Sequence, residues 1–455
     1  MSAMSLTDDI KDDSILIDSA SVADDQLSEL PQARPHIHET RKFPDGFLWG
    51  AATAAHQVEG NNVNCDWYRW EQAGHVLRGQ VSGQACDQFN RYEEDFDLAA
   101  ELGNNTHRLS IEWARIEPED GRFDQEVILH YRHVLEALRK RGLSPMVTLW
   151  HFTLPQWFAD RGGWESSGAV ARFARYSEMM AKELGDLVDL WVTINEPMIY
   201  LAQSYGTGVW PPGKKGAWRV LRVFGRLVRA HRASYDRLHR QLDREGYQAR
   251  VGIAKNVVTY EPYRRYSELD GIFIRLADRL FNHQFFIWTR GKHDFIGVNY
   301  YFHYRIRYRP TKISSFFHEV HTENREVSDL GWEINPDGMF DALMSMSRYK
   351  LPVYVTENGI ASADDGKRPR ALVAMVKEVY HAIKAGVDVR GYYHWSLLDN
   401  FEWEKGYDGK FGLVAVDFKT QQRQPRRSYY VYQDICRENG IRHDLLRFLG
   451  HGVRW

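Results

Sequence analysis

The stretch Val353-Tyr354-Val355-Thr356-Glu357-Asn358-Gly359 decides the fold. Four β-favouring residues lead, without a polar break, into an acid, an amide and a glycine, which is typical of a buried strand that ends at a turn. Residues 190–197 have the same form: an apolar strand places Glu196 last, and Pro197 cannot continue the hydrogen-bonded ladder. The sequence therefore predicts two carboxylic acids, each at the carboxyl end of a buried strand.

Strand-like and helix-like segments alternate along the rest of the chain. Strands are predicted at residues 43–53, 106–113, 145–152, 190–196, 250–255, 295–301, 353–357 and 389–396, and helices at 95–102, 126–141, 170–184 and 218–244. Strands that alternate with helices pair in parallel through crossovers. Eight such units over roughly 400 residues predict an α/β fold, a (β/α)8 TIM barrel that forms a single domain with inserted βα loops. A doubly wound open sheet is the alternative, disfavoured because no G-x-G-x-x-G follows the first strand.

The composition excludes several classes of function. The chain has 455 residues, of which 43% are hydrophobic and 26% charged, an ordinary balance for a globular protein. A formal net charge of −2 gives no electrostatic argument for binding nucleic acid or an anionic membrane, and no apolar run is long enough for a membrane span. The three cysteines, Cys65, Cys86 and Cys436, indicate neither a disulfide framework nor a zinc site. With no signal-peptide pattern at the N-terminus, these features predict a cytoplasmic protein.

Two charged segments lie outside the alternating pattern. Residues 1–40 are acidic and rich in Ser and Asp, which predicts a disordered leader before a barrel domain at 41–455. A partner-binding tail is the alternative for this segment. The basic residues between positions 214 and 232 are predicted to form the solvent face of a helix, and phosphate binding is the less favoured interpretation.

Residues at the carboxyl ends of barrel strands converge on one pocket. The candidates, in chain order, are Gln57, Glu59, Arg108, His151, Asn195, Glu196, Asn299, Tyr301, Glu357, Trp395, Asn400, Glu402 and Trp403. They contain no His and Asp cluster at metal-ligand spacing and no Ser-His-Asp signature, so neither a metal nor a cofactor is predicted. Two acids on strand ends are the residue types that cleavage of a glycosidic bond requires.

Six short segments carry a resemblance to one family. They are FLWGAATAAHQVEG at 47–60, LPQW at 154–157, TINEP at 193–197, DFIGVNYY at 294–301, TENG at 356–359 and WSLLDNFEW at 395–403. Together, and in this order, they resemble glycoside hydrolase family 1, the retaining β-glucosidase and β-galactosidase family. The resemblance extends over about residues 43–423.

The resemblance implies roles for the residues that match its motifs. Glu196 corresponds to the general acid/base and Glu357 to the nucleophile, a pair whose carboxyl groups lie about 5–5.5 Å apart in retaining enzymes. Arg108 and Tyr301 correspond to hydrogen-bond donors to Glu357, and Asn195 to the ligand of the sugar 2-hydroxyl. The two acids need opposite protonation at one pH, so a desolvated Glu196 should keep its proton while a hydrogen-bonded Glu357 stays ionised.

The resemblance also implies the substrate class. Gln57, His151, Asn299, Glu402 and Trp403 correspond to residues that bind the non-reducing sugar, Trp395 to the floor on which it stacks, and Trp332 to the wall of the aglycone subsite. By residue type alone the three tryptophans would be assigned to the core. The implied activity is that of an exo-β-glycosidase that acts on small β-glucosides, with β-galactosides and β-fucosides as further substrates. The carboxylate of Glu402 would repel a 6-phosphate, which disfavours the phospho-glycosidases.

The chain departs from the family pattern in three places. Phe152-Thr153 follow the pocket histidine where family glucosidases usually have Trp-Asp, and His56 replaces a frequent Tyr. The connection between residues 282–286 and 293–295 is short, and the aromatic side chains at 281, 285, 286 and 288 either seal the resulting gap or line a groove. A sugar-binding barrel without turnover is therefore the alternative hypothesis, because a small displacement in the pocket would abolish catalysis. The presence of Glu196 excludes a thioglucosidase that lacks an acid/base, whereas the natural aglycone and the oligomeric state are left open.

Overall fold

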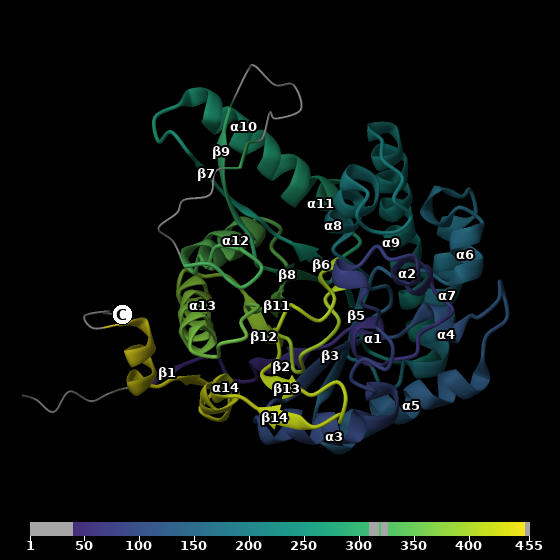
Figure 1. Ribbon diagram of the computed structural model, residues 1–455, viewed down its shortest axis with the longest axis horizontal. Coiled ribbons are helices and arrows are strands. Elements are labelled where there is room, and N and C mark those ends of the chain that lie inside the picture. Colours follow the sequence, from purple (N-terminus) through teal and green to yellow (C-terminus); the bar gives the residue numbers. More distant parts are fainter. Residues whose placement is uncertain (1–39, 309–317, 320–325, 451–455) are drawn as a thin grey trace, which may run out of the picture. The chain divides into compact units, whose positions relative to one another are not determined.

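The computed structural model describes residues 40–308, 318–319 and 326–450, and a closed barrel of eight parallel strands lies at its centre (Figure 1). The barrel strands are β2 (Leu48–Ala52), β3 (Thr106–Ser110), β4 (Ser144–Thr148), β5 (Leu190–Asn195), β6 (Arg250–Asn256), β8 (Phe295–Asn299), β11 (Val353–Asn358) and β12 (Val389–Trp395). They pair in chain order, and β12 closes the barrel on β2 through the parallel register from Gly391↔Leu48 to Trp395↔Ala52. The predicted (β/α)8 barrel is confirmed.

Long helices form the layer around the barrel (Figure 1). They are α3 (Gln88–Glu101), α5 (Gln125–Lys140), α7 (Ala169–Leu184), α9 (Ala217–Glu245), α10 (Glu268–Asp278), α12 (Asp337–Ser347), α13 (Lys367–Lys384) and α14 (Arg427–Arg437). Each long helix buries an apolar stripe at helical spacing, as Val223, Leu227 and Leu238 do on α9. The basic side of α9, with Arg222 and Arg229, is exposed, as the charge pattern predicts.

The core has two layers because side chains of a strand alternate between the two faces of the sheet. Met146, Val192, Phe295 and Tyr393 pack inside the barrel. A larger cluster, with Ile253 among its members, fills the space between the strands and the helices. The apolar runs of the strands are thus buried on both faces, as parallel sheets require.

The strand ends differ from the predicted ones where the chain turns toward the pocket. The third segment stops at Ser110, and Trp113 begins the short helix α4 (Trp113–Ile116). β4 ends at Thr148, so His151 lies on a loop beyond the strand, next to Phe152 with its positive φ of 76°. Gln57 was predicted at a strand end but lies on the helix α1 (Ala55–Val58). Apolar residues continue past the last ladder bond in each case, which hides the strand end from a reading of hydrophobicity.

An arm of strands and one helix rises from the barrel after β6 and β8 (Figure 1). Its three-stranded sheet contains β7 (Thr259–Pro262), β9 (His303–Arg307) and β10 (His318–Glu319). Helix α10 continues through the π-helical turn η4 (Arg279–His283) into α11 (Gln284–Trp288), which leads directly to β8. Phe285 and Phe286 are buried and fill the side left by the short connection, whereas Trp288 is 53% exposed.

The remaining elements are short. They are β1 (Arg41–Lys42), α2 (Asp66–Gln72), η1 (Leu77–Gly79), α6 (Gln156–Asp160), η2 (Gly163–Glu165), α8 (Pro197–Leu201), η3 (Ala202–Thr207), η6 (Trp403–Lys405), β13 (Val414–Val416), β14 (Arg423–Pro425), β15 (Gly440–Ile441) and η7 (His443–Leu449). The barrel unit begins at Thr40, and the predicted acidic leader lies outside the described residues. All three cysteines are free and buried. No helix among the described residues is long and apolar enough to cross a membrane.

Candidate active site

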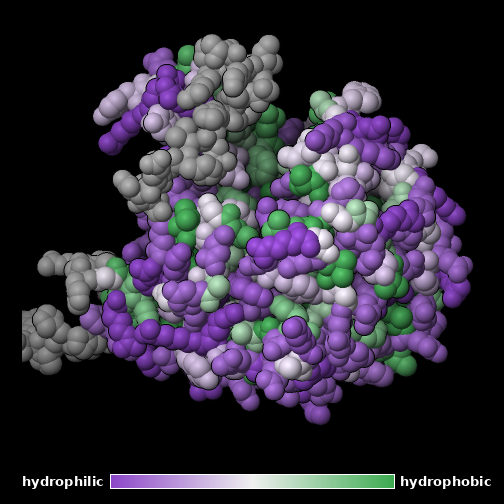
Figure 2. Space-filling view, in the orientation of Figure 1, coloured by the Kyte–Doolittle hydropathy of each residue, from purple (hydrophilic) through white to green (hydrophobic). Residues whose placement is uncertain are grey.

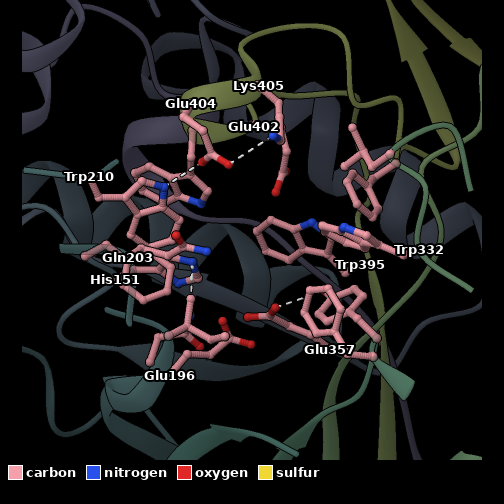
Figure 3. A pocket seen from close by; sticks show the side chains of 18 residues that line it. His151, Glu196, Gln203, Trp210, Trp332, Glu357, Trp395, Glu402, Glu404 and Lys405 are labelled. Atoms are coloured by element: carbon pink, nitrogen blue, oxygen red, sulfur yellow. Dashed lines mark hydrogen bonds and ion pairs between the residues drawn. The ribbon is translucent and has the colours of Figure 1, made fainter. Parts of the chain in front are cut away.

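One pocket opens at the carboxyl ends of the barrel strands and collects most of the predicted site residues (Figure 3). Glu196 follows the end of β5 and Glu357 lies near the end of β11, and their carboxyl groups lie together at one side of the pocket (Figure 3). The predicted residues that line it are His151, Asn195, Glu196, Tyr301, Trp332, Glu357, Trp395, Glu402 and Trp403. Arg108, Asn299 and Gln57 lie directly behind this lining, hydrogen-bonded to its acids.

A left-handed backbone turn aims Glu196 into the pocket. Its φ and ψ are 43° and 59°, and its N–H donates to the carbonyl of Ala254 at 2.8 Å. Pro197 then begins α8, because a proline at the first helical position needs no hydrogen-bonded N–H. A left-handed conformation at a non-glycine residue costs roughly 1–3 kcal/mol, and such strain clusters at functional sites.

Glu357 is held by a charge-assisted network. Arg108 Nη1 donates to Oε1 of Glu357 at 2.5 Å, and the hydroxyl of Tyr301 donates to Oε2 at 2.9 Å. Arg108 also donates to the side chain of Asn195 at 2.7 Å, so its buried charge has partners on both sides. Burial raises the pKa of Glu357, and the Arg108 charge with the hydrogen bonds from Arg108, Tyr301 and Asn299 opposes that rise.

Glu196 has fewer partners. Asn299 Nδ2 donates to its Oε1 at 2.9 Å, and the carboxyl group is otherwise surrounded by the pocket wall. Burial and the nearby charge of Glu357 raise the pKa of Glu196 to about 8, with Asn299, Lys255 and Arg108 opposing. We infer that Glu357, which has the arginine, loses its proton first, so that near neutral pH the pocket holds one ionised and one protonated carboxyl group.

Asn195 and His151 form the side of the pocket next to Glu196. The Asn195 Oδ1 accepts from Arg108 and from Asn299, at 2.7 and 3.2 Å, which leaves its Nδ2 turned toward His151 Nε2 at 3.3 Å. Burial and the charge of Arg108 lower the pKa of His151 far below its usual value, so the ring is neutral. Its Nδ1 has no hydrogen-bond partner among the described residues and can bond to a ligand hydroxyl.

Aromatic rings form the pocket walls. His151 stacks on Trp395, with ring centroids 5.9 Å apart and an interplanar angle of 12°, and on Trp403 at 6.0 Å and 15°. Trp332 lies on the other side, packed on Phe302 at 4.6 Å (Figure 3). Flat rings with a few oriented polar groups fit a ligand that presents C–H faces and hydroxyl edges.

Gln57 acts on the pocket through Glu402. Its Nε2 donates to Asn400 Oδ1, to the carbonyl of Phe401 and to Glu402 Oε2, at 3.0, 2.9 and 3.3 Å. Burial, followed by the charges of Glu404, Glu357 and Glu196, raises the pKa of Glu402 well above its usual value. Glu59, the other candidate on this segment, turns away and accepts from Tyr131 at 2.7 Å and Arg115 at 2.9 Å.

Several residues that the sequence did not single out also line the pocket. Trp210 packs on Phe152 at 4.8 Å, and its Nε1 donates to Glu404 Oε2 at 2.5 Å. An indole from the segment after η3 thus lies beside the position where the sequence lacks one. Glu404 directly follows the WSLLDNFEW motif and could have been inferred from it, but no local pattern points to Trp210. The other unpredicted lining residues are Ile199, Gln203, Phe302, Leu330, Lys405 and Phe411.

Lys255 is a second unpredicted feature near Glu196. It is wholly buried on β6, next to Ala254, whose carbonyl holds the Glu196 backbone. Its ammonium donates to the carbonyl of Asn256 and lies 4.4 Å from the ring centroid of Phe281. Burial lowers the pKa of Lys255 to about 7, although the charges of Glu196 and Asp278 oppose the shift. A lysine inside an otherwise apolar strand was the available signal.

Metal coordination has no candidate site in the ranges the structure covers. Nowhere among residues 40–308, 318–319 and 326–450 do three or more His, Cys, Asp or Glu side chains group in a way that could hold an ion. The chemistry that the pocket offers is therefore proton transfer and nucleophilic attack by carboxyl groups.

Comparison with known sequences gives matches over most of the chain. The sequence profile of Glycosyl hydrolase family 1 matches residues 39–287 and 275–441. Beta-glucosidase A of Thermotoga maritima is 33% identical over 451 residues, which cover 88% of this chain and 99% of that protein. A β-galactosidase of Pyrococcus woesei is 30% identical, with 88% of this chain and 98% of the relative covered.

Comparison with solved structures agrees with these matches. A β-glycosidase from Pyrococcus horikoshii superposes with a TM-score of 0.84 at 38% identity, covering 90% of this chain and 98% of that chain. The β-glucosidase from Thermotoga maritima in complex with castanospermine superposes with a TM-score of 0.83 at 31% identity, covering 88% and 99%. Both identities are high enough for the likeness to extend beyond the fold.

Proposed function

Because the chain belongs to glycosyl hydrolase family 1, a family of retaining β-glycosidases, we propose that it hydrolyses small, non-phosphorylated β-glucosides from the non-reducing end through a covalent glycosyl-enzyme. The observation that carries this proposal is the pair of Glu196 and Glu357, which share one pocket but have unequal surroundings. Arg108 and Tyr301 support the negative charge of one acid, while the other has a single amide donor.

In the first step the ionised carboxylate of Glu357 attacks the anomeric carbon. The bond from that carbon to the leaving oxygen breaks as Glu196 donates its proton to the oxygen. Asn195, whose amide is fixed by Arg108 and Asn299, is positioned to bond the sugar 2-hydroxyl. The product of this step is a glycosyl ester on Glu357 and a free alcohol.

In the second step water replaces the ester. Glu357 is neutral while it is esterified, so the charge that raised the pKa of Glu196 is gone and Glu196 is ionised. Glu196 then takes a proton from the water that attacks the anomeric carbon, and Glu357 leaves as a carboxylate. Two inversions return the sugar to its original β configuration.

The pocket wall opposite the catalytic pair supports the substrate assignment. Glu402 and Glu404 place carboxyl groups there, which accept hydrogen bonds from sugar hydroxyls and oppose a phosphate or carboxylate (Figure 3). The names of the relatives, β-glucosidase and β-galactosidase, support glucosides first and galactosides second, with β-fucosides as a further possibility within the same class. The cytoplasmic location stays a prediction that the three free cysteines support.

A panel of 4-nitrophenyl β-glycosides, with glucoside, galactoside, fucoside and glucoside 6-phosphate, tests the proposal directly. We expect release of 4-nitrophenol from the glucoside and none from the 6-phosphate. Proton NMR at early times should show β-glucose before mutarotation. Formation of α-glucose first, or hydrolysis of the 6-phosphate in preference to the glucoside, would contradict the proposal, and Glu357→Gln serves as the inactive control.

A further inference from the structure

An apolar groove adjoins the catalytic pocket on the side of Glu196. It lies between the arm and α8 and has a volume of about 410 Å³. Six residues that define it are Met198 of α8, Tyr260 of β7, Tyr304 and Ile306 of β9, and Leu280 and Phe281 of η4. None of these residues has a place in the proposed reaction.

The groove is continuous with the wall of the catalytic pocket. Ile199 lines the pocket and Met198, its neighbour on α8, lines the groove. On β9 and the turn before it, Phe302 faces the pocket and Tyr304 the groove, with their rings stacked at 5.9 Å and 26°. A leaving group that is protonated by Glu196 departs past α8, two residues before Met198. An aglycone long enough to pass Phe302 therefore enters this groove.

The lining of the groove suits hydrocarbon and does not suit a second sugar. Its surface consists mainly of aliphatic carbon and tyrosine and phenylalanine rings. Phe281 also covers the ammonium of Lys255, which is wholly buried beneath it and presents no charge to the groove. A sugar ring buried here would lose hydrogen bonds to water without replacing them, whereas an alkyl chain would lose none.

The apolar surface continues outward along α10. Leu269, Ile272, Leu276 and Leu280 follow one another at helical spacing and are 50%, 50%, 43% and 47% exposed. Figure 2 shows hydrophobic surface where the carboxyl end of α10 borders the hollow beside α8. Contiguous exposed apolar surface on a soluble protein commonly marks a binding site. Leu280 belongs both to the groove and to this outer strip, so the two form one track that leads away from Glu196.

We propose that the groove binds the alkyl chain of the aglycone, which makes long-chain alkyl β-glycosides a preferred substrate class. This inference rests on the proposed function, since it assigns the leaving-group side of the same reaction. The first methylenes pass Phe302, the following ones contact Met198, Tyr304 and Phe281, and a longer chain reaches Leu280 at the exit.

The test uses n-alkyl β-D-glucosides from methyl to octyl, each below the concentration at which it forms micelles. Full burial of one methylene corresponds to up to about fourfold in binding. We expect kcat/KM to rise by about twofold to fourfold per methylene once the chain passes Phe302. The variant Leu280→Asp places a charge at the groove exit and should reduce this gain for hexyl and octyl glucoside by about tenfold, with hydrolysis of methyl and 4-nitrophenyl glucoside unchanged.

Leu129→Asp is the matched control, because Leu129 is 51% exposed on α5 and lies outside the groove. It should keep the full dependence on chain length. An equal dependence in the wild type and in Leu280→Asp, or no dependence in the wild type, overturns the assignment of the groove. If 4-nitrophenyl glucoside is hydrolysed in either case, the proposed function stands and only the inference about the aglycone fails.

A binding measurement tests the groove without turnover. Octyl and methyl 1-thio-β-D-glucosides are resistant analogues whose Kd values can be compared by calorimetry. We expect the octyl compound to bind at least tenfold more tightly than the methyl compound, and Leu280→Asp to remove most of that ratio. Equal Kd values for the two analogues would overturn the inference even if no substrate were hydrolysed.

Discussion

Arg108 Nη1 lies 2.5 Å from Oε1 of Glu357, and the two side chains are 1% and 4% exposed in total. A buried carboxyl group with a single neutral donor would keep its proton, so this arginine is what allows Glu357 to be a nucleophile. Glu196 occupies the same pocket without such a partner. The difference between the two acids is therefore set by the position of one guanidinium group, and the variants below probe that difference.

Replacement of Arg108 by Met should raise the pKa of Glu357 and reduce its attack on the sugar. Glu357 must be ionised to react, so activity is present above its pKa, and a higher pKa moves the acidic limb of kcat/KM toward higher pH. We expect a shift of at least about one pH unit, because an adjacent opposite charge lowers a carboxyl pKa by about 1–3 units. The pH profile with 4-nitrophenyl β-glucoside measures it. Tyr301→Phe, which removes only a hydrogen bond, should give a smaller shift in the same direction.

Replacement of Glu357 by Gly should abolish hydrolysis of 4-nitrophenyl β-glucoside. Added azide can occupy the space left by the carboxylate and attack the anomeric carbon once, so the product should be the α-glucosyl azide. NMR of the azide adduct identifies its configuration. A β-azide, or activity that persists without azide, would show that another group forms the covalent intermediate.

Replacement of Glu196 by Ala should affect substrates according to their leaving groups. Alkyl alcohols leave only when protonated, so methyl β-glucoside should lose about 10²–10⁴-fold in kcat, the usual contribution of a general acid. A 2,4-dinitrophenyl glucoside needs no proton and should form the covalent intermediate at nearly the normal rate. Pre-steady-state release of dinitrophenol measures that step. Equal losses for both substrates would argue against an acid role for Glu196.

Replacement of Lys255 by Met should move the basic limb of the pH profile. The Lys255 ammonium lowers the pKa of Glu196, and activity requires protonated Glu196, so it is lost as pH rises through that pKa. Without the cation the pKa of Glu196 rises, and the basic limb of kcat/KM moves to higher pH. Lys255→Arg, which keeps a charge, should leave the limb closer to that of the wild type. A shift to lower pH in Lys255→Met would contradict the electrostatic assignment.

The same substitution should change stability in a pH-dependent way. Burial lowers the pKa of Lys255 to about 7, whereas in the unfolded chain it keeps its ordinary value near 10.5. Between these values the unfolded chain binds the additional proton, so the lysine destabilises the fold most at and below pH 7 and ceases to do so as pH approaches 10.5. Lys255→Met should thus raise the free energy of unfolding at pH 7 by up to about 4 kcal/mol. Guanidinium denaturation at pH 7 and pH 10 checks that the gain diminishes at the higher pH.

The local sequence determined the barrel because each strand is a short apolar run bounded by turn residues, and such runs can be buried only between helices. Val353–Asn358 and Leu190–Asn195 became barrel strands for this reason, and both place an acid at the same end of the sheet. The motifs around Glu196, Glu357 and Trp395 likewise placed the centre of the site. The ends of β3 and β4 were predicted too late, because the apolar residues that follow Ser110 and Thr148 pack as loop and helix rather than as strand.

Tertiary structure alone decided which distant side chains complete the pocket. Trp210 fills the space beside Phe152 and bonds to Glu404, 194 positions further along the chain, a contact that no local pattern encodes. The groove beside Met198 exists because β7, β9 and α10 rise together from different parts of the chain. Residue types and spacing determined the fold and the reacting pair, since both follow from local chemistry. The protonation of that pair and the shape of the leaving-group side depend on which charges and rings are brought close in three dimensions, and only the folded chain sets those distances.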